Sequence, residues 1–75
     1  MSSNNFHISP EGHFWKVSLN GIHQMQFPTQ ESAYDYARRT ARMMGGGEIS
    51  IHGRDGRVRE KNTIYPANDP RNIFG

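Results

Sequence analysis

Arginine is the residue type in this sequence with the clearest chemical potential, because most of the arginines lie between Arg38 and Arg59. The planar guanidinium group of arginine matches the geometry of phosphate groups. Two of these arginines are one helical turn apart, and three surround an expected hairpin, so together they could contact a phosphate backbone. The residues predicted as phosphate contacts are Arg38, Arg42, Arg54, Arg57 and Arg59.

A solvent-exposed basic face would explain the same arginines without any ligand. The formal net charge of the chain is only +2, and Asp55 and Glu60 lie among the basic residues. Asp55 is also suited to accept hydrogen bonds from the turn amides beside it. Nucleic-acid binding is therefore one hypothesis for this segment, and a solvated surface is its alternative.

The histidines and acidic residues offer little for metal binding or catalysis. A zinc site needs three or four ligands that converge, usually at short sequence spacings. The chain has no cysteine, and His7, His13, His23 and His52 show no such spacing. No serine lies in a nucleophile-elbow motif. We therefore expect no metal, no cofactor, no small-molecule substrate and no enzymatic activity.

A protein-binding surface is the second functional hypothesis. Phe14, Lys16 and His52 are predicted on the sheet face that the helix leaves open. A chain of 75 residues without disulfides has a thin stability margin, and association with another chain would add to it. We expect protein–protein interaction, either self-association or binding to a partner protein, for instance as an inhibitor of a host protein. Nucleic-acid binding is the alternative function.

Three strands are expected in the first part of the chain. Apolar and polar residues alternate along residues 6–9, 14–19 and 22–27, which predicts half-buried strands. Asn20-Gly21 between the second and third runs is a strong signal for a type I′ hairpin turn. The first part of the chain is therefore predicted to form an antiparallel meander.

A helix and two further strands complete the predicted domain. Thr29 is a favourable N-cap, and residues 30–44 have helical periodicity. One narrow apolar stripe of this helix comprises Ala33, Ala37, Ala41 and Met44. Three glycines follow, one of which is expected in the left-handed conformation. Residues 48–52 and 57–60 are predicted as a second hairpin.

These elements predict an α+β fold of order β-β-β-α-β-β, with one helix packed on one face of an antiparallel sheet. Residues 6–61 would form a single domain, between a disordered N-terminus at 1–5 and a loosely ordered tail at 62–75. The expected core residues are Trp15, Val17, Ala37, Met44, Ile49 and Ile51. No apolar run is long enough to span a membrane, and the polar start does not resemble a signal peptide, so we expect a cytoplasmic protein.

The segment 47–61, with sequence GEISIHGRDGRVREK, resembles the signature of a small bacterial and phage family, the domain of unknown function 2188. Further matches to that family are Trp15-Lys16-Val17, Thr29, Ala33, Ala37-Arg38 and Asp69-Pro70. Phe14 stands where members usually have glycine. The resemblance implies the α+β fold and a bacterial or phage protein, and it implies no activity.

Overall fold

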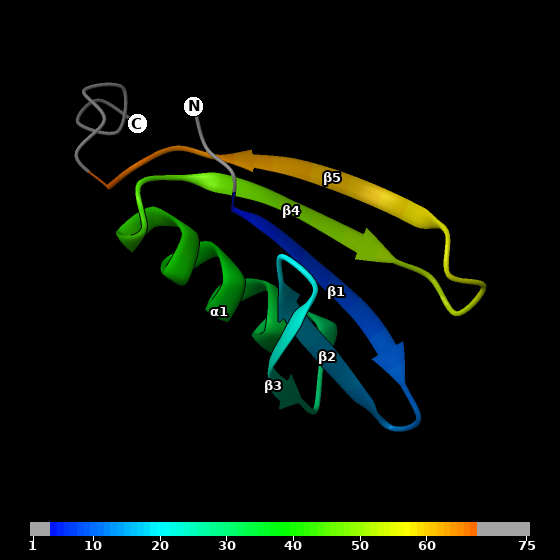
Figure 1. Cartoon of the computed structure of the whole chain (residues 1–75). Coiled ribbons are helices and arrows are strands. Elements are labelled where there is room, and N and C mark those ends of the chain that lie inside the picture. The colour runs from blue at the N-terminus through cyan, green and yellow to red at the C-terminus, as the bar shows by residue number, and fades with distance from the viewer. Residues whose placement is uncertain (1–3, 68–75) are drawn as a thin grey trace.

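A computed structural model describes residues 4–67 of the chain. Its elements are β1 (Asn5–Glu11), β2 (Phe14–Leu19), β3 (Ile22–Phe27), α1 (Gln30–Met43), β4 (Gly47–His52) and β5 (Val58–Ile64). The strands form one sheet in the order β3-β2-β1-β4-β5, and α1 contacts all five of them (Figure 1). The predicted α+β order β-β-β-α-β-β is confirmed. No helix in the described part of the chain is long and apolar enough to cross a membrane.

The sheet is mixed, so the prediction of an antiparallel sheet is wrong for one pair of strands. β1 runs parallel to β4, with Phe6 opposite Ile49 and Ile8 opposite Ile51. The pairs β1–β2, β2–β3 and β4–β5 are antiparallel. Because two hairpins leave β3 pointing in the direction of β1 and α1 then carries the chain back, β4 enters the sheet parallel to β1.

The first hairpin and the start of the helix follow the local sequence signals. Asn20 and Gly21 have φ angles of 52° and 86°, as a type I′ turn requires. Thr29 is the N-cap of α1, and its side-chain oxygen accepts a hydrogen bond from the backbone N–H of Ser32 at 3.1 Å. These two signals fix where β3 begins and where the helix starts.

The helix ends one residue earlier than the sequence predicts. The backbone N–H of Gly46 donates to the carbonyl oxygen of Ala41 at 2.7 Å, and Gly45 has a φ of 93°, which together make a glycine cap. Met44 is the C-cap residue and is 44% exposed. The prediction of Met44 as a core residue is therefore wrong, because the helix ends at Met43 and its apolar stripe does not continue to Met44.

Small side chains bring α1 close to the sheet. The fully buried residues are Phe6, Ile8, Val17, Ala33, Ala37, Ala41 and Ile49. Ile51 is also buried, while Trp15 is only partly buried and packs against the edge of the core. The predicted core is confirmed at Val17, Ala37, Ile49 and Ile51. Phe6 and Ile8, expected to share one face of a half-buried strand, are fully enclosed.

The outer ends of the sheet extend further than expected. β1 begins at Asn5, and β5 continues to Ile64, which pairs with Gly47. Residues 62–64 therefore belong to a strand, although they were expected in the tail. Pairing along the whole of β4 overrides their weak strand propensity. Residues 1–3 and 68–75 of the predicted termini lie outside the described residues.

A matched pair of valine substitutions tests this core. Val17 is fully buried, whereas Val58 is 53% exposed on another strand. Val17→Ala should lower the free energy of unfolding by about 2 kcal/mol, through lost burial and the cavity left behind. Val58→Ala should change it by less than about 0.5 kcal/mol. Urea unfolding measures both, and equal losses would contradict the assignment of the core face.

Candidate functional site

The face of the sheet opposite α1 carries a row of polar side chains. Ser18 on β2 lies opposite His7 on β1, His7 opposite Ser50 on β4, and Ser50 opposite Lys61 on β5. Residues paired across neighbouring strands share a face, so these four lie on one side. His7, Ser18 and Ser50 thus lie on the face of the sheet that α1 leaves open.

Two histidines meet on this open face. His52 Nε2 lies 2.9 Å from Nδ1 of His7. The other nitrogen of His52, Nδ1, lies 3.0 Å from the carbonyl oxygen of Gly56. Because a carbonyl oxygen only accepts, Nδ1 of His52 carries a proton. Only one proton can then lie between Nε2 of His52 and Nδ1 of His7, because protons on both nitrogens would repel each other.

Burial and nearby positive charge disfavour protonation of His7. Burial lowers the pKa of His7 below its usual value of 6.5, and the nearby charges of His52 and Lys61 lower this pKa further. Lys61 is itself paired with Glu48, with Nζ and Oε1 3.4 Å apart. Among residues 4–67, no group of three metal-ligating side chains includes these histidines.

The residues predicted for a protein interface share the open face. Lys16 lies opposite Ser9, and Phe14 is two residues before Lys16 on the same strand. His52 is reached across β1 through its contact with His7. Phe14 is 49% exposed, but the side chains around it are mainly polar. The three residues are thus on one surface, and that surface is not an apolar patch.

The hairpin arginines form one basic group. Arg54, Arg57 and Arg59 lie in or next to the turn between β4 and β5. Asp55 Oδ1 accepts the backbone N–H of Arg57 at 3.0 Å, which is the turn role predicted for it. Within the described residues, none of these three guanidinium groups takes part in an ion pair or hydrogen bond. Their positive charge is therefore available to a ligand.

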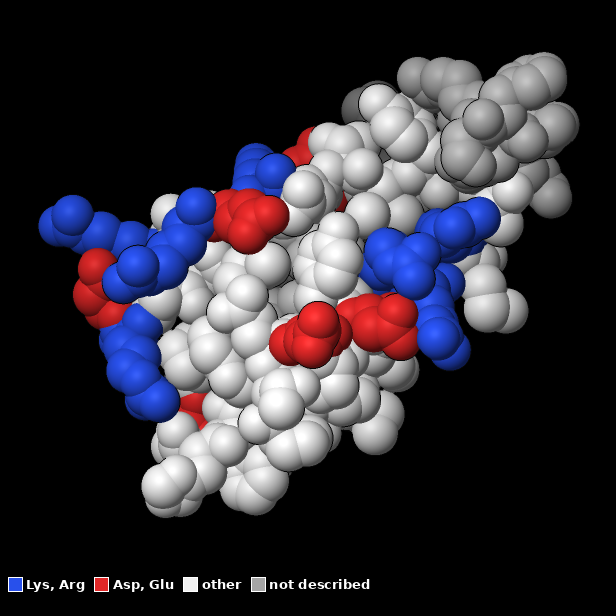
Figure 2. Space-filling model, turned by 180° about the vertical axis from the view of Figure 1, so that it is seen from behind, with Lys and Arg blue, Asp and Glu red and all other residues white. Residues whose placement is uncertain are grey.

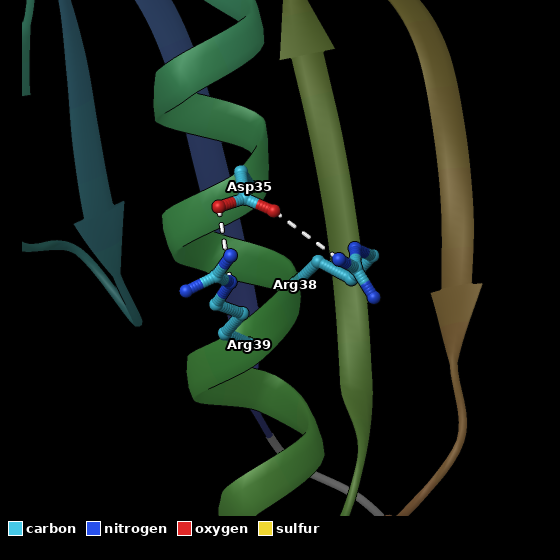
Figure 3. Close-up of polar contacts among 3 residues, drawn as sticks. All are labelled: Asp35, Arg38 and Arg39. Atoms are coloured by element: carbon cyan, nitrogen blue, oxygen red, sulfur yellow. Dashed lines mark hydrogen bonds and ion pairs between the residues drawn. The ribbon is translucent and has the colours of Figure 1, made fainter.

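The arginines of α1 form a second group, and two of them are paired with an acid. Asp35 bonds Arg38 at 3.1 Å and Arg39 at 3.0 Å, one carboxylate oxygen to each (Figure 3). Arg38 and Arg42 lie together beside Thr63 and Ile64, where β5 ends. Exposed pairs of this kind add only a few tenths of a kcal/mol to helix stability. Here the two ion pairs with Asp35 neutralise part of the positive charge of the helix arginines.

The five predicted phosphate contacts do not form one continuous surface. Arg59 and Ile64 lie near opposite ends of β5, which separates the two arginine groups by roughly 17 Å. Figure 2 shows the Lys and Arg side chains in groups at opposite ends of this view, with Asp and Glu side chains between them. Glu31 and Glu60 line the same hollow in this intervening region. A single nucleic-acid strand that contacted both arginine groups would have to pass these acids, which repel its phosphate groups.

The edge strand β3 is a feature that the sequence patterns did not single out. β3 is the outermost strand next to β2, so one side of its backbone has no neighbouring strand within residues 4–67. Ile22 is 68% exposed and Met25 is 46% exposed. Residues 22–27 include no charged side chain. The sequence signal at this strand is an uncharged run between two turn signals. Such a run does not indicate whether the strand lies at the edge of the sheet.

Acidification should weaken the fold through His7. Because folding lowers its pKa, the unfolded chain takes up this proton more readily, so the free energy of unfolding should fall as pH drops below about 6.5 and level off below the folded-state pKa. His7→Gln should reduce this slope, whereas His13→Gln, in an exposed turn, should leave it unchanged. Urea unfolding between about pH 7 and pH 5 measures the slopes. Identical slopes in the wild type and His7→Gln would rule out this role.

Comparison with known proteins places the chain in a family. No curated protein and no solved structure matches it. A family model described as an uncharacterized protein conserved in bacteria, DUF2188, matches residues 6–64. This match covers the whole sheet apart from the first residue of β1, together with the helix. The family description names no activity, ligand or partner. The chain belongs to the DUF2188 family of uncharacterized bacterial proteins.

Proposed function

We propose that this protein is a non-catalytic protein-binding module that associates with a second copy of itself through the free edge of β3. The observation that carries the proposal is the combination of an uncharged edge strand with exposed apolar side chains at Ile22 and Met25. An unpaired strand edge presents a row of backbone donors and acceptors to another strand. Strand addition is a common way for proteins to use such an edge.

The other edge of the sheet lacks these properties. β5 carries Arg59, Glu60 and Lys61 in succession, and charged side chains on an edge oppose pairing with another chain. β3 has neither charges nor proline between Ile22 and Phe27. The contrast between the two edges supports β3 as the side on which a partner strand would pair.

A second copy is the partner that best fits the chemistry of this edge. Two β3 strands related by a two-fold axis run antiparallel and place the same side chains against each other, as isologous interfaces do. Because residues 20–30 carry no formal charge, this pairing brings no like charges together. Strand addition buries a small area, so we expect a concentration-dependent equilibrium rather than a permanent dimer.

The open sheet face is the weaker candidate for protein binding. Phe14 and Val58 are its exposed apolar residues, at 49% and 53%, while Lys16, His7 and Lys61 keep it polar. A polar face is what a sheet covered on only one side shows to water. A cytoplasmic location remains part of the proposal, and the absence of cysteine from the sequence is compatible with it.

Charges placed on β3 should abolish self-association. Ile22→Lys/Met25→Lys puts two like charges on each copy of the edge, which should leave a monomer at concentrations where the wild type associates. Val58→Lys places a charge at an exposed site on the opposite edge strand and is the matched control. Sedimentation equilibrium over a wide concentration range measures both. A wild-type chain that stays monomeric throughout would refute the proposal.

Nucleic-acid binding is a second candidate, favoured by the unpaired guanidinium groups of the hairpin. If it occurs, Arg54→Ala/Arg57→Ala should weaken binding to a mixed DNA and RNA pool and reduce its salt dependence. Arg38→Ala/Arg39→Ala should have a smaller effect, because Asp35 already neutralises part of that pair. Electrophoretic mobility shifts at two salt concentrations measure this. No shift at low salt would exclude this function.

A further inference from the structure

We propose that a cleft at one corner of the fold binds a compact anion carried on a flat ring, with a nucleoside monophosphate as the smallest biological group of this kind. The cleft lies between the start of α1 and the hairpin that joins β4 to β5. Its lining residues are Trp15, Gln30, His52, Gly53, Arg54 and Arg59. This site is separate from the β3 edge and does not depend on self-association.

The cleft has the size of a small-ligand site. Its volume is about 390 Å³, and ligand pockets commonly begin at roughly 300 Å³. A neighbouring hollow of about 470 Å³ shares Gln30 with it and is also lined by Tyr34, Glu31 and Glu60. The two hollows therefore lie next to each other at the start of α1. One is lined by arginines and the other by acids.

A β-bulge directs Arg59 to this corner. Ile51 lies opposite Glu60, and His52 lies opposite Val58, so Arg59 is the extra residue on β5. Bulges redirect side chains in this way. The guanidinium stem lies across the backbone of Gly53, where a Cβ atom would collide with Nε of Arg59. Glycine at this position therefore leaves room for the Arg59 side chain to approach the backbone.

The two arginines of the cleft have free hydrogen-bonding capacity. Arg54 and Arg59 make no ion pair or hydrogen bond through their guanidinium groups within residues 4–67. Arg38 and Arg39, by contrast, are both held by Asp35. Two unpaired guanidinium groups on one cleft provide the planar, multiple donors that a phosphate group accepts.

Trp15 explains why the anion should be attached to a flat ring. It is only partly buried, and it lines the cleft together with both arginines. Indole faces stack on planar heterocycles, and such stacking contributes about 1–3 kcal/mol for a nucleic-acid base. A phosphate on the arginines and a ring near the indole would occupy neighbouring parts of the same cleft.

The acids of the neighbouring hollow would set the orientation of such a ligand. Glu31 and Glu60 repel a phosphate group but accept hydrogen bonds from sugar hydroxyls or ring amino groups. A nucleoside monophosphate would therefore place its phosphate near Arg54 and Arg59 and its donor groups toward the acids. The sequence patterns predicted no small-molecule ligand, because the cleft lining comes from three separate segments of the chain.

Binding can be followed at the single tryptophan of the chain. We would titrate the full-length protein with adenosine monophosphate and record the indole N–H signal of Trp15 by nuclear magnetic resonance. A saturable shift is expected with adenosine monophosphate and a weaker response with inorganic phosphate or adenosine. A 5′-phosphorylated oligonucleotide distinguishes the two sources of this chemistry. Tighter binding of the oligonucleotide points to a strand end, and tighter binding of the monophosphate points to the free nucleotide.

Three variants connect the signal to the cleft. Arg59→Gln should weaken binding about tenfold through loss of a charged hydrogen-bond donor. Gly53→Ala keeps both charges but displaces Arg59, and it should also weaken binding. Arg57→Gln removes a hairpin charge that does not line the cleft, so it should leave the affinity for adenosine monophosphate unchanged, whatever its effect on a nucleic-acid strand. Circular dichroism confirms that each variant is folded.

Two outcomes would overturn the proposal. One is the absence of a saturable Trp15 response to adenosine monophosphate at millimolar concentration. The other is equal weakening by Arg59→Gln and Arg57→Gln, which would indicate a diffuse effect of hairpin charge. The β3 variant Ile22→Lys/Met25→Lys should retain ligand binding, so failure of the cleft and failure of self-association are separable.

Discussion

The structure depends on one helix covering one face of a sheet that is wider than the helix. A helix of 14 residues is about 21 Å long and about 10 Å wide, whereas five strands span roughly 19 Å between the outer two. The helix therefore protects a strip of the sheet rather than the whole face. Ala33, Ala37 and Ala41 bring it close enough to enclose the centre of that strip. The parts of the sheet outside this strip must either be solvated by water or be covered by another molecule.

Three uncovered regions follow from this geometry, and each has a different chemistry. The open face is lined by serine, lysine and histidine side chains, which water can solvate. The β3 edge is uncharged and carries exposed Ile22 and Met25. At the hairpin corner, the start of α1 leaves Trp15 only partly covered beside two unpaired arginines. The β3 edge exposes apolar side chains and unpaired backbone groups, and the hairpin corner combines unpaired guanidinium groups with a partly exposed indole. For these reasons the two regions carry our proposals.

Local sequence signals accounted for most of the fold. Asn20-Gly21, Thr29 and the alanine stripe act within a few residues of themselves, so their consequences could be predicted correctly. The parallel pairing of β1 with β4 could not be derived in this way, because it depends on which strand is free when the chain returns from the helix. Met44 has the correct periodicity for the core, but the helix has ended when the chain reaches it.

The candidate sites were less predictable than the fold. Basic residues are visible in a sequence, but the distance between the helix group and the hairpin group is a tertiary property. The contact between His7 and His52 joins residues from β1 and β4, and the sequence patterns did not predict this contact. The β3 edge and the Trp15 cleft are defined by missing neighbours. A sequence pattern does not show which residues lack a neighbour in the fold, so both features are identified only in the three-dimensional structure.

Residue-resolved amide hydrogen exchange at low and high protein concentration tests the central claim most directly. If the protein binds a second copy through the edge of β3, exchange at the outward-facing amides of residues 22–27 should slow as concentration rises. The amides of β5 should exchange at an unchanged rate. Unchanged exchange along β3, or new protection around Phe14 and Lys16 instead, would contradict the claim that β3 is the protein-binding edge.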